Sequence, residues 1–383
     1  MIIGRRRSRR RWVPALLAAL IGIGTFLGLS YGQPGLVLPF APTPTLPPPT
    51  PTPPTARPHL EEAARLQAGG RLGEAIAEYR QAISAEPYLP EPYLRLARIL
   101  VFRRDPAAAV ANARKALEIS PAAAEAYALL AVAYDWNDDP DQAIAAARKA
   151  IELNPGLAEA HAFLAEALAD KQRLDDAATE VQRALALDPN NVEAIRVKGY
   201  LYEVQARYQE AADQYQRAVD IAPGQPYLHL LLANVLNARG ELDSALAQFQ
   251  QAAALDPEDP RPLAGMGSCY YAQGTYPKAE ELLKAALALD PDYAAALGQL
   301  ALTYYAQKKN AEAIPYFLKA IQLEKSPQRL ASYHHAAGWS LYAERRYQEA
   351  REQFTQALQL DPGLQGARDG LEMAKRAEQE GAR

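Results

Sequence analysis

A 34-residue period is the feature that most constrains the fold of this chain. Seven prolines follow one another at this spacing, and an eighth follows after a further 71 residues, which is two units with a three-residue insertion. These prolines are Pro87, Pro121, Pro155, Pro189, Pro223, Pro257, Pro291 and Pro362. A fixed period of this length is typical of a solenoid, in which each unit packs only against its neighbours. The sequence therefore predicts nine units between about Ala56 and Leu364.

Small residues occupy three fixed positions in every unit. Alanine stands twelve and five residues before the proline or its equivalent, as Ala143 and Ala150 do before Pro155. A third position, such as Ala131 or Gly199, accepts only Ala or Gly. Large apolar residues recur around these positions at helical spacing. Each unit is therefore predicted to be two amphipathic helices that cross closely at the small residues.

This pattern resembles the tetratricopeptide repeat family over most of the chain. One unit carries the family skeleton as Tyr127, Leu130, Ala131, Tyr134, Ala143, Ala147, Ala150 and Pro155. The resemblance implies an all-α fold, a right-handed α-solenoid of about nine helix pairs at residues 59–364. First helices would line an inner groove, second helices would form an outer wall, and residues 365–383 would form a capping helix. Pro315, which lies inside a predicted second helix, suggests a kink there.

The segment before the repeats predicts a membrane anchor. Residues 1–11 hold six arginines, residues 12–32 carry no charge, and residues 33–58 form a Pro/Thr-rich linker. An apolar run of this length matches the hydrocarbon thickness of a bilayer. Because arginine-rich flanks stay in the cytoplasm, the linker and repeats are expected outside it. A signal peptide that is cleaved, giving a secreted protein, remains the alternative.

Partners are constrained by charge and by the anchor. The chain has a net charge of −4, and the repeats are more acidic still because the six leading arginines lie outside them. This balance argues against a nucleic-acid partner and favours proteins or peptides. Gly24, Gly28 and Gly32 are spaced four apart, which would allow two anchor helices to form a homodimer.

No pattern in the sequence predicts catalysis, a cofactor or a metal site. His59, His161, His229 and His334 share one position of the repeat, where this family normally places a packing aromatic residue. Cys269 is the single cysteine and is expected to be a small buried residue. Asp138 and Asp139 lack the spaced oxygen ligands of a calcium loop. Asp105 and Asp139, each followed by proline, are expected to cap second helices.

The inner sites of the family map onto two kinds of side chain in this sequence. The N-terminal half would be acidic and the C-terminal half aromatic, with amides between them. These groove residues are Glu125, Glu159, Glu193, Asn234, Asn237, Tyr271, Tyr305, Trp339 and Tyr342. They predict a partner segment that is basic at one end and apolar at the other. The alternative is that the acids form a solvated face and the tyrosines pack between repeats.

Two functions fit this organisation. The chain would be a non-enzymatic, membrane-anchored scaffold at the cell envelope that binds a partner in its groove. Alternatively, it would be an accessory or regulatory subunit of a separate envelope enzyme or of a secretion or assembly machine. The number of clients would separate these two functions, because a scaffold takes many and a subunit takes one.

Overall fold

The computed structural model describes residues 55–381, and in this range the chain forms nineteen α-helices and no strand. The predicted basic flank, the predicted transmembrane helix and most of the predicted linker lie outside the described residues. Between residues 55 and 381, no helix combines the length and apolar character needed to cross a membrane.

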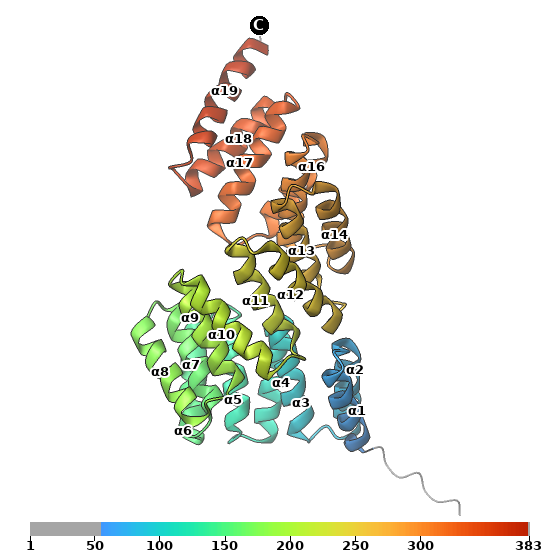
Figure 1. The fold of residues 1–383 in the computed structure, drawn as a ribbon, viewed down its shortest axis with the longest axis vertical. Coiled ribbons are helices and arrows are strands. Elements are labelled where there is room, and N and C mark those ends of the chain that lie inside the picture. The colour runs from blue at the N-terminus through green and yellow to red at the C-terminus, as the bar shows by residue number, and fades with distance from the viewer. Residues whose placement is uncertain (1–54, 382–383) are drawn as a thin grey trace, which may run out of the picture. The chain divides into compact units, whose positions relative to one another are not determined.

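The helices form nine consecutive pairs followed by one single helix (Figure 1). The first helices are α1 (Ala56–Ala68), α3 (Pro90–Phe102), α5 (Ala124–Asp135), α7 (Ala158–Asp170), α9 (Val192–Val204), α11 (Pro226–Ala238), α13 (Pro260–Ala272), α15 (Ala294–Ala306) and α17 (Pro327–Ala343). The second helices are α2 (Leu72–Ala85), α4 (Pro106–Ile119), α6 (Pro140–Leu153), α8 (Leu174–Leu187), α10 (Tyr208–Ile221), α12 (Leu242–Leu255), α14 (Tyr276–Leu289), α16 (Asn310–Leu323) and α18 (Tyr347–Leu360). The predicted all-α solenoid of nine helix pairs is thereby confirmed.

The small-residue positions are where the helices of a pair touch. Both recurring alanine positions are fully buried in all nine units, as at Ala143 and Ala150. Glycine fills the third position in three units, at Gly199, Gly267 and Gly338. A Cβ on Gly199 would lie 2.7 Å from the ring of Tyr215, and one on Gly338 would lie 2.6 Å from the ring of Phe354. Close helix crossing therefore depends on the absence of side-chain volume at these sites.

Every turn between the two helices of a unit contains one residue in the left-handed region. Glycine fills this position in three units, at Gly70, Gly240 and Gly274, with φ between 73° and 80°. The other six units use residues with a Cβ: Arg104, Asp138, Gln172, Ala206, Lys308 and Arg345. The backbone N–H of the next residue donates a hydrogen bond back to the first helix, as Asp105 N does to Leu100 O at 2.9 Å. This is the bonding of a Schellman motif, which ends each first helix.

Prolines and caps set several helix boundaries. Asp105 and Asp139 accept hydrogen bonds from backbone N–H groups at the starts of α4 and α6, as predicted. The first helix begins at Ala56, inside the predicted 33–58 linker. Pro58 does not prevent this, because it lies in the first turn, where a backbone N–H has no intrahelical partner. The expected kink at Pro315 does not interrupt α16, which runs from Asn310 to Leu323.

The single helix α19 (Gln365–Gly381) covers the end of the stack. Its Ala367 and Ala374 are fully buried, and a Cβ on Gly370 would lie 2.4 Å from the ring of Phe354. Phe354 in α18 therefore packs against a helix on each side. This contact removes from water the apolar face that a last repeat would otherwise expose.

Candidate functional site

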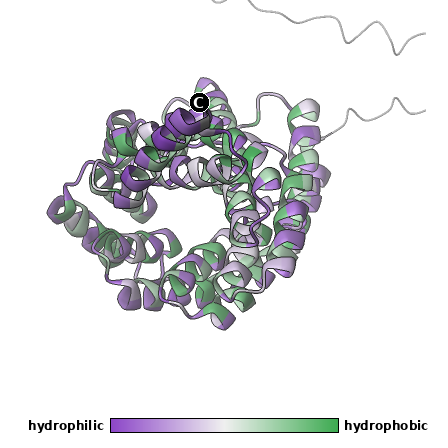
Figure 2. Cartoon of the chain, turned by 90° about the horizontal axis from the view of Figure 1, so that it is seen from above, coloured by the Kyte–Doolittle hydropathy of each residue, from purple (hydrophilic) through white to green (hydrophobic). Residues whose placement is uncertain are grey.

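The first helices carry all nine predicted groove residues. The three acids occupy the second position of consecutive first helices: Glu125 in α5, Glu159 in α7 and Glu193 in α9. The other six are Asn234 and Asn237 in α11, Tyr271 in α13, Tyr305 in α15, and Trp339 and Tyr342 in α17. Viewed along the stack, the helices of the described residues are arranged in a ring (Figure 2).

Arg98 neutralises two of the three predicted acids. Its Nη2 lies 2.8 Å from a carboxylate oxygen of Glu159 and 3.5 Å from one of Glu125. The Glu159 side chain is only 12% exposed, whereas that of Glu125 is 50% exposed. Glu125 is therefore the acid of the three that solvent reaches most easily.

The third acid, Glu193, lies in a buried network around Arg196. The Arg196 guanidinium donates to Glu193 at 2.6 Å and to both carboxylate oxygens of Glu166 at 2.8 and 2.5 Å. Trp136 Nε1 donates to Glu166 at 3.1 Å, and the Tyr227 hydroxyl donates to Glu193 at 2.5 Å. Arg196 therefore pairs with two carboxylates that both lie out of water.

Two carboxyl groups beside this network have no cationic partner among residues 55–381. Asp135, at the end of α5, is 5% exposed, and neither of its carboxyl oxygens has a hydrogen-bond partner among the described residues. Burial, reinforced by Glu166 and Asp170, raises the pKa of Asp135 to about 9. Burial also raises the pKa of Asp170, although the Tyr200 hydroxyl donates a hydrogen bond to it. The N-terminal half of the inner surface therefore has more carboxyl groups than cations.

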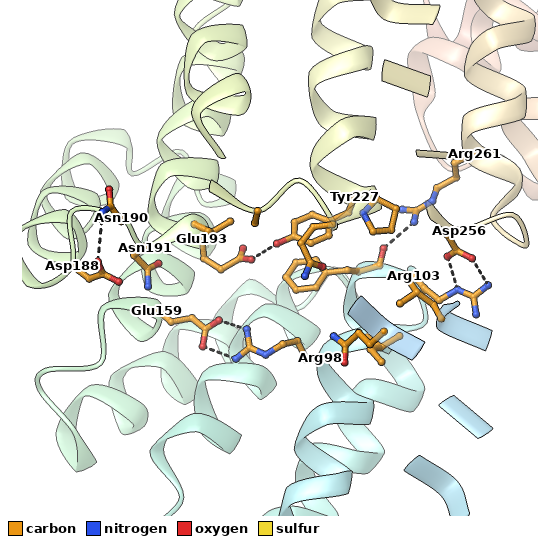
Figure 3. Close-up of a pocket in the computed structure, with 18 residues that line it drawn as sticks. Arg98, Arg103, Glu159, Asp188, Asn190, Asn191, Glu193, Tyr227, Asp256 and Arg261 are labelled. Carbon is orange, nitrogen blue, oxygen red and sulfur yellow. Dashed lines mark hydrogen bonds and ion pairs between the residues drawn. The ribbon is translucent and has the colours of Figure 1, made fainter. Parts of the chain in front are cut away.

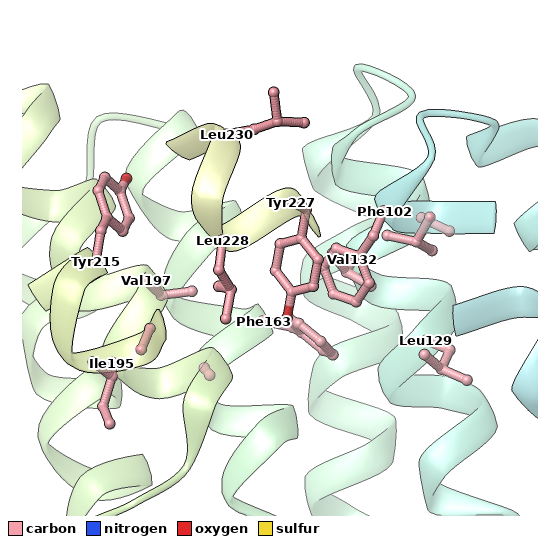
Figure 4. Packing of buried hydrophobic residues seen from close by; sticks show 14 of the residues in the cluster. Phe102, Leu129, Val132, Phe163, Ile195, Val197, Tyr215, Tyr227, Leu228 and Leu230 are labelled. Carbon is pink, nitrogen blue, oxygen red and sulfur yellow. The ribbon is translucent and has the colours of Figure 1, made fainter. Parts of the chain in front are cut away.

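The second unit touches the sixth and seventh units, and this contact closes one turn of the solenoid. The rings of Phe102 and Tyr227 stack with centroids 3.9 Å apart and planes 9° apart (Figure 4). Arg103 pairs with Asp256 at 3.0 Å, and Arg261 donates to the carbonyl of Phe102 at 2.9 Å (Figure 3). We call this contact the seam.

The first unit extends the seam along the turn that joins α1 to α2. A Cβ on Gly70 would lie 2.6 Å from the carbonyl oxygen of Leu255, and one on Gly73 would lie 2.4 Å from the carboxylate of Glu258. Gly70 also has a φ of +75°. Glycine at these two positions therefore lets the backbone of the first unit approach the sixth.

Two cavities lie inside the closed turn. The first has a volume of about 350 Å³ and is lined by the charged residues Arg98, Arg103, Glu159, Asp188, Glu193, Asp256 and Arg261, with amides and apolar groups between them (Figure 3). The second, of about 330 Å³, lies between α1, α3 and the start of α11. Gln67 and Gln225 line both cavities, so the two adjoin. Their sizes fall in the range of ligand-binding pockets.

The predicted aromatic half of the groove does not line these cavities. Tyr271, Tyr305, Trp339 and Tyr342 are partly buried against the apolar clusters of the last three units. The Trp339 and Tyr342 rings meet edge to face at 5.8 Å, and burial raises the pKa of the Tyr271 and Tyr305 hydroxyls. In α11, Asn234 is exposed and Asn237 accepts a weak bond from the Cys269 thiol at 3.5 Å.

The repeated histidines have a structural role. In four units the histidine Nδ1 contacts a side-chain oxygen nineteen residues later, at 2.7 Å for His161 with Glu180 and 2.7 Å for His229 with Gln248. This contact joins the first helix of a unit to its second helix. Burial raises the pKa of the Cys269 thiol to about 11, which disfavours the nucleophilic thiolate form. Across residues 55–381, no three His, Cys, Asp or Glu side chains are grouped to hold a metal ion.

Sequence reasoning missed the cations and aromatic residues that organise the N-terminal half. Arg196 follows Glu193 by three residues, a spacing that predicts an ion pair on one helix face. Tyr227 follows Glu193 by 34 residues and so occupies the matching place in the next unit. These two residues could have been found from the sequence, but the contact between Arg103 and Asp256 has no local signal.

Family models match most of the repeat region. A model described as "Tetratricopeptide repeat" matches residues 94–158, 137–192 and 164–226, and a second model of the same description matches 259–322 and 292–362. A model described as "TPR repeat" matches residues 233–274. No curated protein matches the sequence.

A solved structure shares the fold. The crystal structure of the APC/C hetero-tetramer Cut9–Hcn1 contains a chain that aligns with a TM-score of 0.67 at 19% identity. The alignment covers 79% of this chain and 59% of that one, so the present chain spans little more than half of its length. Together with the family matches over residues 94–226 and 233–362, this shows that the chain belongs to the tetratricopeptide repeat family.

Proposed function

We propose that this chain is a non-enzymatic scaffold, held at the cell envelope by an N-terminal membrane helix, that binds a segment of a protein partner on its inner surface. Protein interaction is the role that tetratricopeptide repeats and the shared solenoid fold support. The proposal that the partner binds the inner surface rests on a row of aromatic side chains on α13, α15 and α17. Tyr271 and Tyr305 remain partly exposed, and their hydroxyls make no hydrogen bond within residues 55–381.

Aromatic side chains of this kind suit partner binding. They offer a large contact area with few rotatable bonds, and a hydroxyl that can bond to a peptide main chain. Trp339 and Tyr342 extend the row by one further unit. The partner segment is therefore expected to present apolar side chains to the last three units.

Site-specific photo-crosslinking tests this binding face in cells. A photoreactive residue at Tyr305 on α15 is expected to capture a defined partner, whereas one at Glu281, exposed on α14, is not. Replacing Tyr271, Tyr305 and Trp339 with alanine should then weaken binding by a few kcal/mol in sum. The matched Tyr271→Phe/Tyr305→Phe variant keeps the packing and should lose less. Capture only from the outer position would contradict the proposal.

The membrane location rests on the sequence before the repeats. Six arginines precede an uncharged run at residues 12–32, and a proline-rich linker follows it. A reporter fused after Arg383 that works only outside the cytoplasm should be active, and the native chain should fractionate with membranes. Activity of a cytoplasm-only reporter would reverse the topology. A soluble protein that begins near Tyr31 would instead identify a cleaved signal.

The accessory-subunit function remains the second candidate. The solved chain with the shared fold belongs to a hetero-tetramer with a second protein, which is the arrangement that this function requires. Crosslinking from Tyr305 separates the two functions by the number of partners. Several clients support the scaffold, and one stoichiometric partner supports the accessory subunit.

A further inference from the structure

The geometry points to a second binding mode: an extended polypeptide segment with one cationic side chain passes through the closed N-terminal turn and fills its two adjoining cavities. This inference rests on the proposed function, because it assumes a protein partner. It differs from binding in an open groove, because the chain would encircle the segment. Four observations carry it: the charges of the wall, its unused amides, the continuity of the two cavities and the nature of the seam.

The three arginines that line the first cavity are each paired with a carboxylate of the chain. Arg98 is bound to Glu159, Arg103 to Asp256, and Arg261 to Asp259 at 2.7 Å. A negatively charged ligand would have to break one of these pairs. In contrast, the carboxylate of Asp188 forms no ion pair within the described range and only accepts the backbone N–H of Asn190 at 3.0 Å. The wall therefore favours a ligand with one positive charge.

The amides of the wall match a peptide main chain. The side chains of Asn190 and Gln225 make no hydrogen bond among the described residues, and the Asn191 side chain uses only its oxygen, which caps α9. Each amide offers donors and an acceptor, as a peptide group does. Peptide groups of an extended segment would therefore satisfy these side chains with little change in the wall.

The two cavities provide a path through the turn. Gln67 and Gln225 line both cavities and so mark the place where they adjoin. The Gln67 oxygen is fixed by the Tyr79 hydroxyl at 3.0 Å, which leaves its NH₂ group for a ligand. A segment that enters beside Asp188 can therefore continue past α1 and leave near Glu91 and Arg95.

This binding mode requires the seam to open and close. Its polar contacts are the ion pairs of Arg103 with Asp256, which is 2% exposed, and with Glu258, which is 65% exposed, and the hydrogen bond from Arg261 to the carbonyl of Phe102. The exposed Arg103–Glu258 pair contributes little free energy and weakens with salt, whereas the buried Arg103–Asp256 pair makes up most of the polar cost of opening. The apolar part is essentially the Phe102–Tyr227 stack. A partner with folded domains at both ends could therefore enter sideways through the opened seam, and closure would retain it.

A topological trap tests this inference. In a Cys269→Ala background, Gly73→Cys and Glu258→Cys place two thiols across the seam for a short dithiol-reactive crosslinker. The matched control pair is Lys115→Cys and Glu118→Cys, which bridges a single turn of α4. The probe is a peptide selected from a displayed random 12-residue library on the uncrosslinked chain. It is used both with free ends and fused between two small folded domains.

Three results are expected. The two-domain probe should fail to bind a chain that was crosslinked beforehand, and crosslinking after binding should slow its release at least about 100-fold. Both effects should be absent from the control pair. Selected peptides should carry one Lys or Arg and bind at least about tenfold more weakly to Asp188→Asn. Asp290→Asn is the matched control, because Asp290 makes the same backbone contact as Asp188 but lies outside both cavities.

The possible failures are distinguishable. If the two-domain probe binds the crosslinked and open chains equally, the segment does not pass through the turn, and the scaffold function stands. If the folded chain selects no peptide at all, the proposed function fails and this inference fails with it. Selected peptides that lack a cation, or that ignore Asp188→Asn, overturn the charge assignment.

Discussion

Phe102 of the second unit and Tyr227 of the sixth stack face to face, with ring centroids 3.9 Å apart. Units that share no border in the sequence are thereby in contact, and the solenoid closes one turn on itself. Trp136 meets the edge of Phe102 at 5.5 Å, and the Tyr227 hydroxyl binds Glu193. The stack therefore connects the seam to the buried ionic network of the inner surface.

Phe102→Ala is expected to open the seam without unfolding the repeats. The substitution removes the main apolar contact between the two walls and leaves only the Arg103 ion pairs and the Arg261 hydrogen bond across the seam. Spin labels at Gln81 and Glu281, both exposed on second helices, should show longer and broader distances in the variant. Tyr88→Ala is the control, because Tyr88 is 86% exposed, and it should leave the distances unchanged. Unchanged distances in Phe102→Ala would show that the stack does not hold the turn closed.

Ala206→Gly is expected to stabilise the fifth unit. Ala206 has a φ of 57°, a conformation that costs a residue with a Cβ about 1–2 kcal/mol. Glycine avoids this cost, but its greater conformational freedom in the unfolded chain offsets part of the gain. The net gain in the free energy of unfolding should be about 0.5–1 kcal/mol. Gly240→Ala is the reverse test at the same position of the next unit, where the added Cβ would meet nothing within 4 Å. Equal stability of all three chains in urea would contradict the argument.

Arg196→Ala is expected to destabilise the middle of the solenoid strongly. Its removal leaves the carboxylates of Glu166 and Glu193 buried without a cation, which typically costs about 3–5 kcal/mol. Arg173→Ala is the matched control, because Arg173 forms an exposed pair with Asp176. Urea unfolding should separate the two variants, with the control within about 0.5 kcal/mol of wild type. Similar stabilities would mean that the buried pairs contribute nothing.

Within a unit, the sequence predicted the fold well. Helix pairing depends on residues less than 34 apart, and the alanines at its two fixed positions are buried without exception. The left-handed turn position was missed because most units fill it without glycine, as at Arg104 and Ala206. A Schellman turn is imposed there by the surrounding helices and carries no clear compositional signal.

Between units, the sequence predicted much less. The curvature that brings Arg103 to Asp256 accumulates from small rotations at every interface, and no single residue pattern records it. The predicted acids were correctly placed on first helices, but the cations that pair with them came from other positions of the repeat. Whether the predicted groove residues bind a partner stays a prediction.

Asp135 gives the inner surface a pH dependence that can be worked out from its environment. Its pKa is raised to about 9 by burial, with Glu166 and Asp170 adding to the effect, whereas in an unfolded chain it is about 3.9. Between these two values the folded chain holds a proton that the unfolded chain has lost. Stability at this site is therefore fully present below about pH 4 and declines as the pH rises toward 9.

Asp135→Asn removes this titration and keeps the shape of the side chain. The variant should be as stable as wild type near pH 4 and more stable by at least about 1 kcal/mol at pH 8. Urea unfolding at several pH values measures the difference. Asp188→Asn is the matched control, because it makes the same substitution at an exposed position. A difference that shrinks as the pH rises would mean that a cation, and not a proton, satisfies Asp135 in the folded chain.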